Sequence, residues 1–262
     1  MSKDEDEADV ALVMSTTSLS IPRLIGHRGA KASAPENTLA AFARAREEGA
    51  AWVEFDVKLT LDGVPVVIHD ETLERTTNGH GAVRETSLAG LKRLDAGSWF
   101  GPAFKGERVP TLVETLDLFA RLDMGFNLEI KPCPGREAET ARATIAVLDA
   151  HWPDSRPAPV LSSFKAVALT TIRDLAPGYT LGYLAEKLGR GWIDTARLLG
   201  CRTVHPGWHA LAKAQVAEAK AAGFPLLVWT VNEPARAREL LAWGVDALIT
   251  DNPGDLAMAL AR

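Results

Sequence analysis

Short β-rich runs alternate with longer Ala- and Leu-rich runs along almost the whole chain, and this alternation limits the folds available to it. Strands are expected at 22–27, 52–59, 65–69, 125–131, 159–163, 179–184, 202–205, 226–231 and 246–250. Helices are expected at 37–48, 111–122, 136–150, 165–175, 189–199, 211–222, 234–243 and 254–261. Repeated βα units are typical of a parallel sheet with helices outside it. The pattern therefore predicts an α/β fold.

Nine expected strands are one too many for an eight-stranded barrel, and the second and third strands explain the surplus. Residues 60–63 read TLDG, which is turn chemistry between two short β runs. We therefore expect 52–59 and 65–69 to form an antiparallel hairpin, folded about residues 61–62, with position 54 opposite position 69. Eight parallel strands remain, which predicts a TIM-type (β/α)8 barrel. Residues 71–110 contain no clear βα unit and are expected to form a small insertion after the second strand.

The chain is long enough for one large core, with 262 residues of which 47% are hydrophobic. We expect a single barrel domain at 21–262. Residues 1–10 hold five acids and one lysine, which account for most of the net charge of −5. The first 20 residues are therefore expected to be a disordered acidic tail. The remainder is nearly neutral without an evident basic face, so no nucleic-acid partner is expected.

Two further features bear on location and partners. The first 20 residues lack the basic start and apolar core of a secretory signal, and no apolar run approaches the ~18 residues of a membrane span. Cys133 and Cys201 are too few for a disulfide framework. A cytoplasmic protein without stable membrane association is expected, and a homo-oligomer remains open.

Charged side chains are expected at the carboxyl ends of the strands, where βα barrels place their sites. Alternation along the second strand turns Glu54 and Asp56 inward. On the strand at 125–131, Asn127, Glu129 and Lys131 face inward, and Leu128 and Ile130 pack outward against helices. Three converging carboxylates repel one another unless a cation neutralises them. Hard oxygen ligands suit one divalent cation, Mg²⁺ or Ca²⁺.

Two histidines and two basic residues flank these carboxylates. His27 ends the first strand, and the hairpin returns His69 toward the same mouth. Histidine suits acid and base roles because its ordinary pKa of about 6.5 is close to neutral. Arg28 and Lys131 favour an anionic, phosphate-bearing substrate. The set indicates metal-assisted phosphoryl transfer.

Each feature also has a simpler interpretation. A Glu-x-Asp pair is often an exposed strand face, Glu129 and Lys131 can form a structural ion pair, and Trp229 can fill the barrel. His205 precedes Pro206-Gly207 and is a candidate for the barrel mouth. The spacing of Ser33 and Glu36 is that of a capping box at the start of the first helix, as is that of Thr111 and Glu114 farther on. No role is assigned to His80, His151, His209 or Cys133.

The motifs together resemble the glycerophosphodiester phosphodiesterase family, in its bacterial form with a short insertion. They are HRGA at 27–30, PENT at 35–38, EFDV at 54–57, TLDG at 60–63, HD at 69–70, LERTT at 73–77, LDAGSWF at 94–100, VPTL at 109–112, LEIK at 128–131, WTVN at 229–232 and ITD at 249–251. The resemblance covers about residues 21–256.

The resemblance implies a TIM-type barrel that hydrolyses glycerophosphodiesters to sn-glycerol 3-phosphate and an alcohol, through a cyclic glycerol phosphate. The residues matching the family's metal ligands are Glu54, Asp56 and Glu129. Those matching its acid and base are His27 and His69, those matching its phosphate ligands are Arg28 and Lys131, and Trp229 matches the tryptophan that faces the glycerol. The alternatives are a phospholipase D-like enzyme for lysolipid or sphingolipid head groups, and a non-catalytic glycerol-phosphate binding protein.

Overall fold

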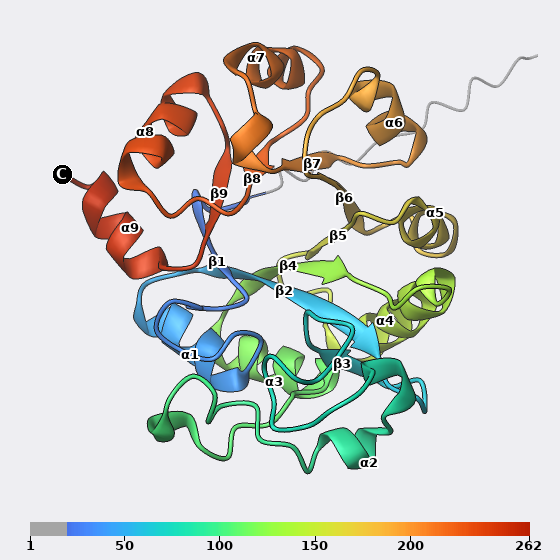
Figure 1. Cartoon of the computed structure of the whole chain (residues 1–262). Helices are drawn as coiled ribbons and strands as arrows, with labels where there is room; N and C mark the ends of the chain where they lie inside the picture. Colours follow the sequence, from blue (N-terminus) through green and yellow to red (C-terminus); the bar gives the residue numbers. More distant parts are fainter. Residues whose placement is uncertain (1–19) are drawn as a thin grey trace, which may run out of the picture.

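A computed structural model describes residues 20–262, and most of the expected tail, at 1–19, lies outside the described residues (Figure 1). A barrel of parallel strands occupies the centre, and helices surround it. The strands are β1 (Leu24–His27), β2 (Trp52–Leu59), β4 (Gly125–Ile130), β5 (Val160–Ser163), β6 (Thr180–Ala185), β7 (Thr203–Pro206), β8 (Leu227–Val228) and β9 (Ala247–Thr250). The TIM-type barrel is confirmed.

The strand order shows how the barrel closes. Neighbouring strands follow the order β7-β6-β5-β4-β2-β1-β9-β8, and their pairing is parallel. Two isolated parallel bridges, Val204 to Leu226 and Gly207 to Trp229, join the β7 side to the β8 side. The first and last strands of the fold, β1 and β9, are therefore direct neighbours.

Helices cover the outside of the barrel after the strands. They are α1 (Leu39–Glu47), α3 (Leu112–Leu122), α4 (Glu137–His151), α5 (Ala166–Leu175), α6 (Trp192–Leu198), α7 (Lys213–Ala221), α8 (Pro234–Trp243) and α9 (Pro253–Leu260). The predicted capping box at α3 is confirmed, since Thr111 and Glu114 cap each other's backbone N–H groups. The prediction for α1 is wrong, because Thr38 caps that helix at Ala41 N and Glu36 lies before it.

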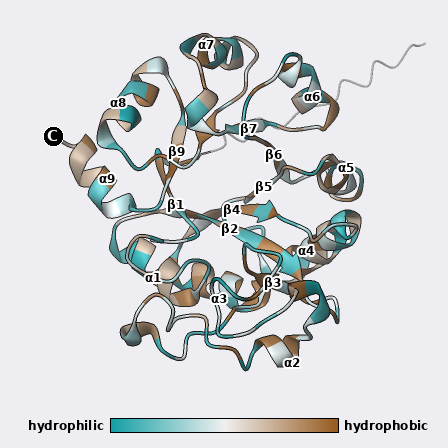
Figure 2. Ribbon diagram, in the orientation of Figure 1, coloured by the Kyte–Doolittle hydropathy of each residue, from teal (hydrophilic) through white to brown (hydrophobic). Residues whose placement is uncertain are grey.

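Apolar side chains of the strands and helices form one buried core, and hydrophobic and hydrophilic residues are interspersed along both kinds of element in the hydropathy colouring (Figure 2). Four phenylalanines join the sheet to α1 and α3, with ring centroids between neighbours 5.1–5.7 Å apart: Phe42, Phe55, Phe119 and Phe126. Leu128 and Ile130 belong to this core, as expected. The outward face of β2 and β4 is thus anchored, which leaves their polar side chains for the barrel interior.

The hairpin is confirmed, but its predicted register is wrong by one residue. Strand β3 (Pro65–Val67) runs antiparallel to β2 and pairs Val67 with Val57. Continued, this register places residue 70, not residue 69, opposite residue 54. The loop holds three residues, 61–63, because Thr60 N donates to Val64 O and Gly63 adopts a left-handed φ of 76°. Glycine accepts this conformation without strain, and the extra residue shifts the pairing.

The segment after β3 forms no βα unit before α3. It contains the short helices η1 (Val83–Glu85), α2 (Leu88–Leu91) and η2 (Pro102–Phe104), and η3 (Trp208–Ala210) follows β7 elsewhere in the chain. A separate small core lies beneath the segment and includes Ile68, Leu73, Val83, Leu91 and Val109. This packing holds the chain that follows β3 against the barrel mouth. Across residues 20–262, none of the helices has the length and apolar character needed to cross a membrane.

Candidate active site

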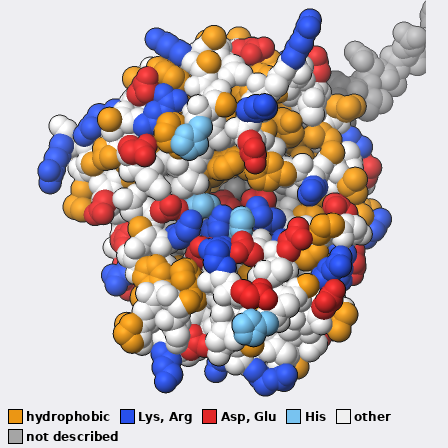
Figure 3. Space-filling view, viewed as in Figure 1, with side chains coloured by type: hydrophobic (Ala, Val, Ile, Leu, Met, Phe, Trp, Pro, Cys, Tyr) orange, Lys and Arg blue, Asp and Glu red, His pale blue; other side chains and the backbone are white. Residues whose placement is uncertain are grey.

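The predicted site residues gather at the carboxyl ends of β1, β2 and β4. A cavity of about 340 Å³ opens there, and seven of the predicted residues line it: His27, Arg28, Glu54, His69, Glu129, Lys131 and Trp229. The eighth, Asp56, is buried behind its rim. Figure 3 shows a hollow near the middle of this face, where Lys or Arg, His, and Asp or Glu side chains meet. The topology thus brings together residues that are distant in the sequence.

The three carboxylates form one buried cluster. Glu54 and Asp56 lie on β2, Glu129 lies on β4, and one oxygen of each is within 4.8 Å of the others. The register explains this approach, because Asp56 pairs with Glu129 directly across the two strands. Oδ1 of Asp56 is buried and accepts no hydrogen bond from residues 20–262. The cluster therefore has the donor type and spacing that a divalent cation requires.

Burial and mutual repulsion set the protonation of these groups. Burial and the charge of Asp56 raise the pKa of Glu54 well above its usual value. The same two causes raise the pKa of Glu129 to about 7. Burial also acts on Asp56, but the charges of Arg28 and Lys131 outweigh it and lower its pKa. Ionising all three adjacent carboxyl groups costs electrostatic free energy, so an added positive charge would stabilise the cluster.

Arg28 and Lys131 stand beside this cluster. Lys131 Nζ lies 2.9 Å from Glu129 Oε1 and 3.7 Å from Asp56 Oδ1. Arg28 Nε lies 3.3 Å from Asp56 Oδ2. These two positively charged side chains lie beside the carboxylates on the wall of the same cavity. They can therefore bind the oxygens of a phosphate group.

A strained turn places Arg28. Its φ is 54°, a left-handed conformation that non-glycine residues seldom adopt, and its N–H donates to Glu54 O at 2.8 Å. Gly29 follows with a φ of 90°, and a Cβ there would lie 2.6 Å from the backbone of Ala41. Glycine at 29 is therefore required for α1 to approach β1 and for the turn to aim Arg28 into the cavity.

His27 is oriented by a carboxylate from the other end of the chain. Its Nδ1 lies 2.6 Å from Asp251 Oδ1, and Asn232 Nδ2 donates to Asp251 Oδ2 at 2.9 Å. Burial acts to raise the pKa of Asp251, but the bond to His27 prevails and the pKa is about 2. An ionised carboxylate only accepts hydrogen bonds, so Nδ1 carries the proton and Nε2 is free to accept one. Burial lowers the pKa of His27, which favours the neutral imidazole.

His69 also has a carboxylate partner, Asp70, which is its neighbour in the chain. Its Nδ1 lies 2.6 Å from Asp70 Oδ1, and burial lowers its pKa below the usual value. Arg75 donates to both oxygens of Asp70 and to both oxygens of Glu36. Glu36 in turn accepts from Arg28 Nη1 at 2.6 Å. A continuous chain of ion pairs thus joins His69 to Arg28.

Sequence reasoning missed the four residues that orient these groups. The sequence shows Asp70, Arg75 and Asp251 only as members of motifs, and the spacing of Ser33 and Glu36 predicts a helix cap for Glu36. The available signals were the adjacency of Asp70 to His69 and the position of Asp251 just after β9. Neither signal identifies which side chain the aspartate contacts, because that depends on which strands become neighbours when the barrel closes.

Aromatic residues form another part of the wall. Trp229 lines the cavity, donates from Nε1 to His205 O at 2.8 Å, and meets Phe164 edge-on with centroids 5.7 Å apart. The suggestion that His205 lines the mouth is wrong. Its side chain is fully buried in the barrel, and burial lowers its pKa to about 3.

A second cavity, of about 490 Å³, adjoins the first. It shares five residues with it: His69, Glu129, Lys131, Phe164 and Glu186. Its remaining wall includes Lys58, Asp70, Glu71 and Lys165. The two cavities meet at His69, so one substrate can occupy both.

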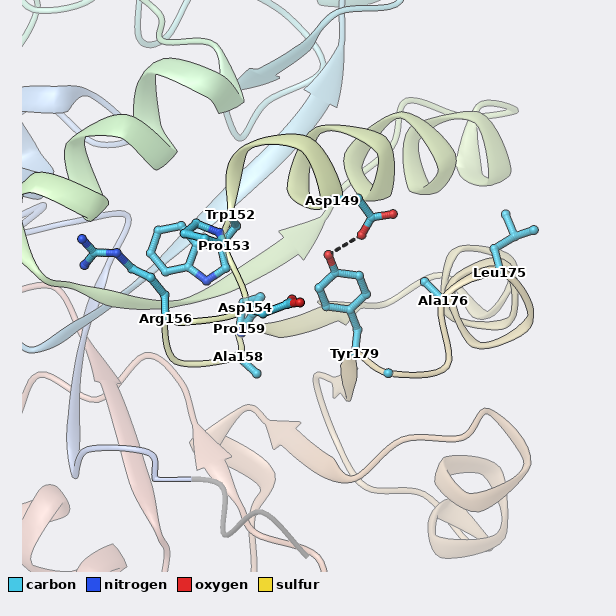
Figure 4. Close-up of a pocket in the computed structure, with 11 residues that line it drawn as sticks. Asp149, Trp152, Pro153, Asp154, Arg156, Ala158, Pro159, Leu175, Ala176 and Tyr179 are labelled. Atoms are coloured by element: carbon cyan, nitrogen blue, oxygen red, sulfur yellow. Dashed lines mark hydrogen bonds between the residues drawn. The ribbon is translucent and has the colours of Figure 1, made fainter. Parts of the chain in front are cut away.

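A third cavity, of about 420 Å³, lies away from this site, where the loops after α4 and α5 enter β5 and β6 (Figure 4). Trp152, Leu175 and Tyr179 line it, and the Tyr179 hydroxyl donates to Asp149 at 2.7 Å. These loops precede the strands, so they occupy the amino-terminal face of the barrel. The cavity contains none of the predicted site residues.

The comparisons with known proteins agree with this geometry. The glycerophosphoryl diester phosphodiesterase family matches residues 27–255. A glycerophosphodiester phosphodiesterase of Caldanaerobacter subterraneus is 38% identical over 238 residues, which span 89% of this chain and 95% of that protein. One from Bacillus subtilis is 34% identical over 248 residues, spanning 87% and 83%. The structure of an Oleispira antarctica phosphodiesterase in complex with the product sn-glycerol-3-phosphate superposes with a TM-score of 0.90 at 40% identity, covering 92% of this chain and 98% of that one.

Proposed function

Because the chain belongs to the glycerophosphoryl diester phosphodiesterase family and is an enzyme of that activity, we propose that it releases sn-glycerol 3-phosphate and an alcohol with one divalent cation and two histidines. The observation that carries the proposal is the pairing of two Asp-oriented histidines, His27 and His69, around one carboxylate cluster. The product named for the Oleispira antarctica structure supports the same assignment.

The carboxylate cluster fits the cation. Glu54, Asp56 and Glu129 would hold Mg²⁺ or Ca²⁺, since they supply oxygen donors and an unsatisfied Asp56 Oδ1. When bound, the cation would supply positive charge beside the phosphate and ease ionisation of the attacking hydroxyl. Arg28 and Lys131 would hold the phosphate oxygens from the adjacent wall.

The histidines would move the protons. His27 Nε2 would take the proton of the glycerol hydroxyl next to the phosphate, and that oxygen would form a bond to phosphorus. The bond from phosphorus to the alcohol oxygen would break, and His69 would protonate that oxygen. Water would then open the cyclic phosphate with the two roles reversed. Burial lowers the pKa of both imidazoles, and the His27 side chain is the less exposed of the two, at 13% against 26%, which favours neutral His27 as the base. The anionic phosphate of the substrate would raise the pKa of the more exposed His69, which suits the acid.

The second cavity favours a small polar alcohol over a lipid. Charged groups line it, including Lys58, Glu71 and Lys165. Lys58 Nζ donates to Lys131 O, and Glu71 and Lys165 are exposed to solvent, so this wall offers charged groups to a polar alcohol and would lose hydration against an acyl chain. This observation argues against the phospholipase D-like alternative.

The test is turnover of a panel of glycerophosphodiesters carrying choline, ethanolamine, glycerol or inositol, with glycerol 3-phosphate detected directly. The protein is first treated with EDTA, and Mg²⁺ or Ca²⁺ is then added back. Activity that is lost with EDTA and restored by one cation supports the proposal. Full activity in EDTA would remove the cation from it, and release of the alcohol without glycerol 3-phosphate would overturn the reaction.

A further inference from the structure

Asn127 lines the active-site cavity as a buried polar residue that has no hydrogen-bond partner among residues 20–262. The residue lies on β4 with 1% of its surface exposed. Neither its Nδ2 nor its Oδ1 makes a hydrogen bond within residues 20–262. A buried amide left unpaired costs on the order of 1–3 kcal/mol for each group. A residue that carries this cost on a cavity wall is a candidate for contact with a ligand.

The register places Asn127 on the deeper part of that wall. Glu54 pairs with His27 on one side and with Asn127 on the other, so these three residues lie level across β1, β2 and β4. Asp56 and Glu129 lie two residues farther toward the mouth. Asn127 therefore lies level with His27, the proposed base. It lies deeper in the barrel than Lys131, one of the proposed phosphate ligands.

The neighbours of Asn127 in the cavity are mostly apolar or charged. Leu184, Trp229 and Ile249 line the apolar part of the cavity. The charged residues on its wall are the carboxylates and the basic side chains that pair with them.

Under the proposed function, a glycerol unit in this cavity would have its phosphate toward Arg28 and Lys131 and one hydroxyl toward His27. Of the remaining polar groups on the wall, Glu186 is exposed and Thr230 is partly exposed, so both can be hydrated, whereas Asn127 is buried and has no hydrogen bond within residues 20–262.

We propose that Asn127 recognises the remaining glycerol hydroxyl, the one that does not attack phosphorus, and so makes the enzyme selective for glycerol. The inference rests on the proposed function. A hydroxyl donates one hydrogen bond and accepts others, and a carboxamide offers both complements, Oδ1 as acceptor and Nδ2 as donor. Asn127 is a specificity residue that contacts substrate without moving a proton.

An internal water is the competing explanation. Ser162 Oγ and His205 Nδ1 are also buried without partners among the described residues. His205 is packed tightly in this region, since a Cβ on Gly182 would lie 2.6 Å from its Nε2 and 3.1 Å from Ser162 Cβ. A water shared by these groups and Asn127 would satisfy the amide with no part in selectivity.

The experiment compares two diesters with the same leaving alcohol. One carries glycerol, and the other carries ethylene glycol, which keeps the attacking hydroxyl and lacks the remaining one. The wild-type enzyme should prefer the glycerol substrate by about tenfold or more in kcat/KM, because the analogue leaves the amide unpaired. Asn127→Leu should bring the ratio close to one, chiefly by slowing the glycerol substrate.

Two variants serve as controls. Thr144→Val removes another buried hydroxyl that has no partner in the described part of the chain; it lies on α4, outside the cavity, and its loss should leave the ratio unchanged. Ser162→Ala should also leave it unchanged. If each of Ser162→Ala and Asn127→Leu lowers kcat/KM by the same factor for both substrates, the amide holds a water. The inference is then overturned.

The wild-type enzyme alone also decides the matter if Asn127→Leu does not fold. Equal kcat/KM for the two diesters would overturn the role of Asn127 and leave the proposed function intact. Absence of turnover on every glycerophosphodiester would instead overturn the proposed function.

Discussion

The two histidines have matched environments but are assigned different roles, and the leaving group can separate them. Alanine at either position should lower kcat by ~10²–10⁴-fold, the usual value of one positioned acid or base. If His69 is the acid, His69→Ala should harm choline release severely and p-nitrophenolate release much less, because p-nitrophenolate departs without a proton. His27→Ala should harm both equally. Steady-state rates on the two substrates measure the difference, and identical responses from both variants would contradict the division of labour.

Asp251 provides a second residue-scale prediction. Its contact with His27 raises the pKa of that imidazole and fixes Nδ1 as the protonated atom. Asp251→Asn should therefore lower kcat and move the acidic limb of the pH profile to lower pH, since His27 then loses its proton more readily. Asp149→Asn is the matched control, because that carboxylate bonds Tyr179 at the opposite face. A lower kcat with an unmoved acidic limb would mean that Asp251 acts only by supporting the fold.

Local elements were predicted well where one pattern decided them, and less well where two competed. The alternation of Val53, Phe55 and Val57 correctly predicted which face of β2 is apolar. The register of the hairpin was wrong, because composition does not distinguish a two-residue from a three-residue loop. Glu36 was misplaced because the spacing of a capping box does not reveal whether two arginines, Arg28 and Arg75, compete for the same carboxylate.

The same ion pairs join the loop before α1 to the segment after β3, which predicts a pH-dependent stability. Burial acts to raise the pKa of Glu36, but bonds from Arg75 and Arg28 lower it to about 2. The folded pKa lies below the unfolded one, so the stabilisation is complete above about pH 4.5 and is lost as pH falls toward 2. It amounts to about 3 kcal/mol at pH 7 and roughly half of that at pH 3.

Chemical denaturation of Glu36→Gln and wild type at several pH values measures this contribution. The difference in unfolding free energy should be largest near pH 7 and should shrink as the pH is lowered. Glu47→Gln is the control, because Glu47 makes an exposed pair with Arg44 and should change stability by less than about 1 kcal/mol. A difference for Glu36→Gln that is independent of pH would rule out the ion pairs as its source.

At the scale of the whole molecule, barrel closure decides what the sequence could reveal. Glu54, Asp56 and Glu129 were recognisable because strand alternation alone turns them inward. The contact of His27 with Asp251 spans 224 positions and exists only because β1 and β9 become neighbours. The unpaired amide of Asn127 is likewise invisible in the sequence, since pairing depends on what every adjacent strand presents to the interior.

If the carboxylate cluster holds a cation as proposed, we expect cation binding to be coupled to the stability of the whole barrel. The folded pKa values of Glu54 and Glu129 are raised, so without a cation their ionisation destabilises the fold as pH rises from about 4.5 through about 7. A divalent cation held by the ionised carboxylates, as proposed, should reverse this loss. At 100 times its Kd a cation adds about 2.7 kcal/mol. For a chain of this length that corresponds to a rise in Tm of roughly 5–10 °C.

Thermal unfolding with EDTA and with each cation, at pH 5.5 and pH 8, tests this coupling independently of activity. The rise in Tm should be larger at pH 8, because protons compete with the cation for the carboxylates at pH 5.5. Glu129→Gln should abolish most of the rise while removing the repulsion that destabilises the cation-free protein, so its Tm in EDTA at pH 8 should equal or exceed that of wild type. A wild-type Tm that is insensitive to both cations, or a rise that survives in Glu129→Gln, would show that these three carboxylates do not share an ion.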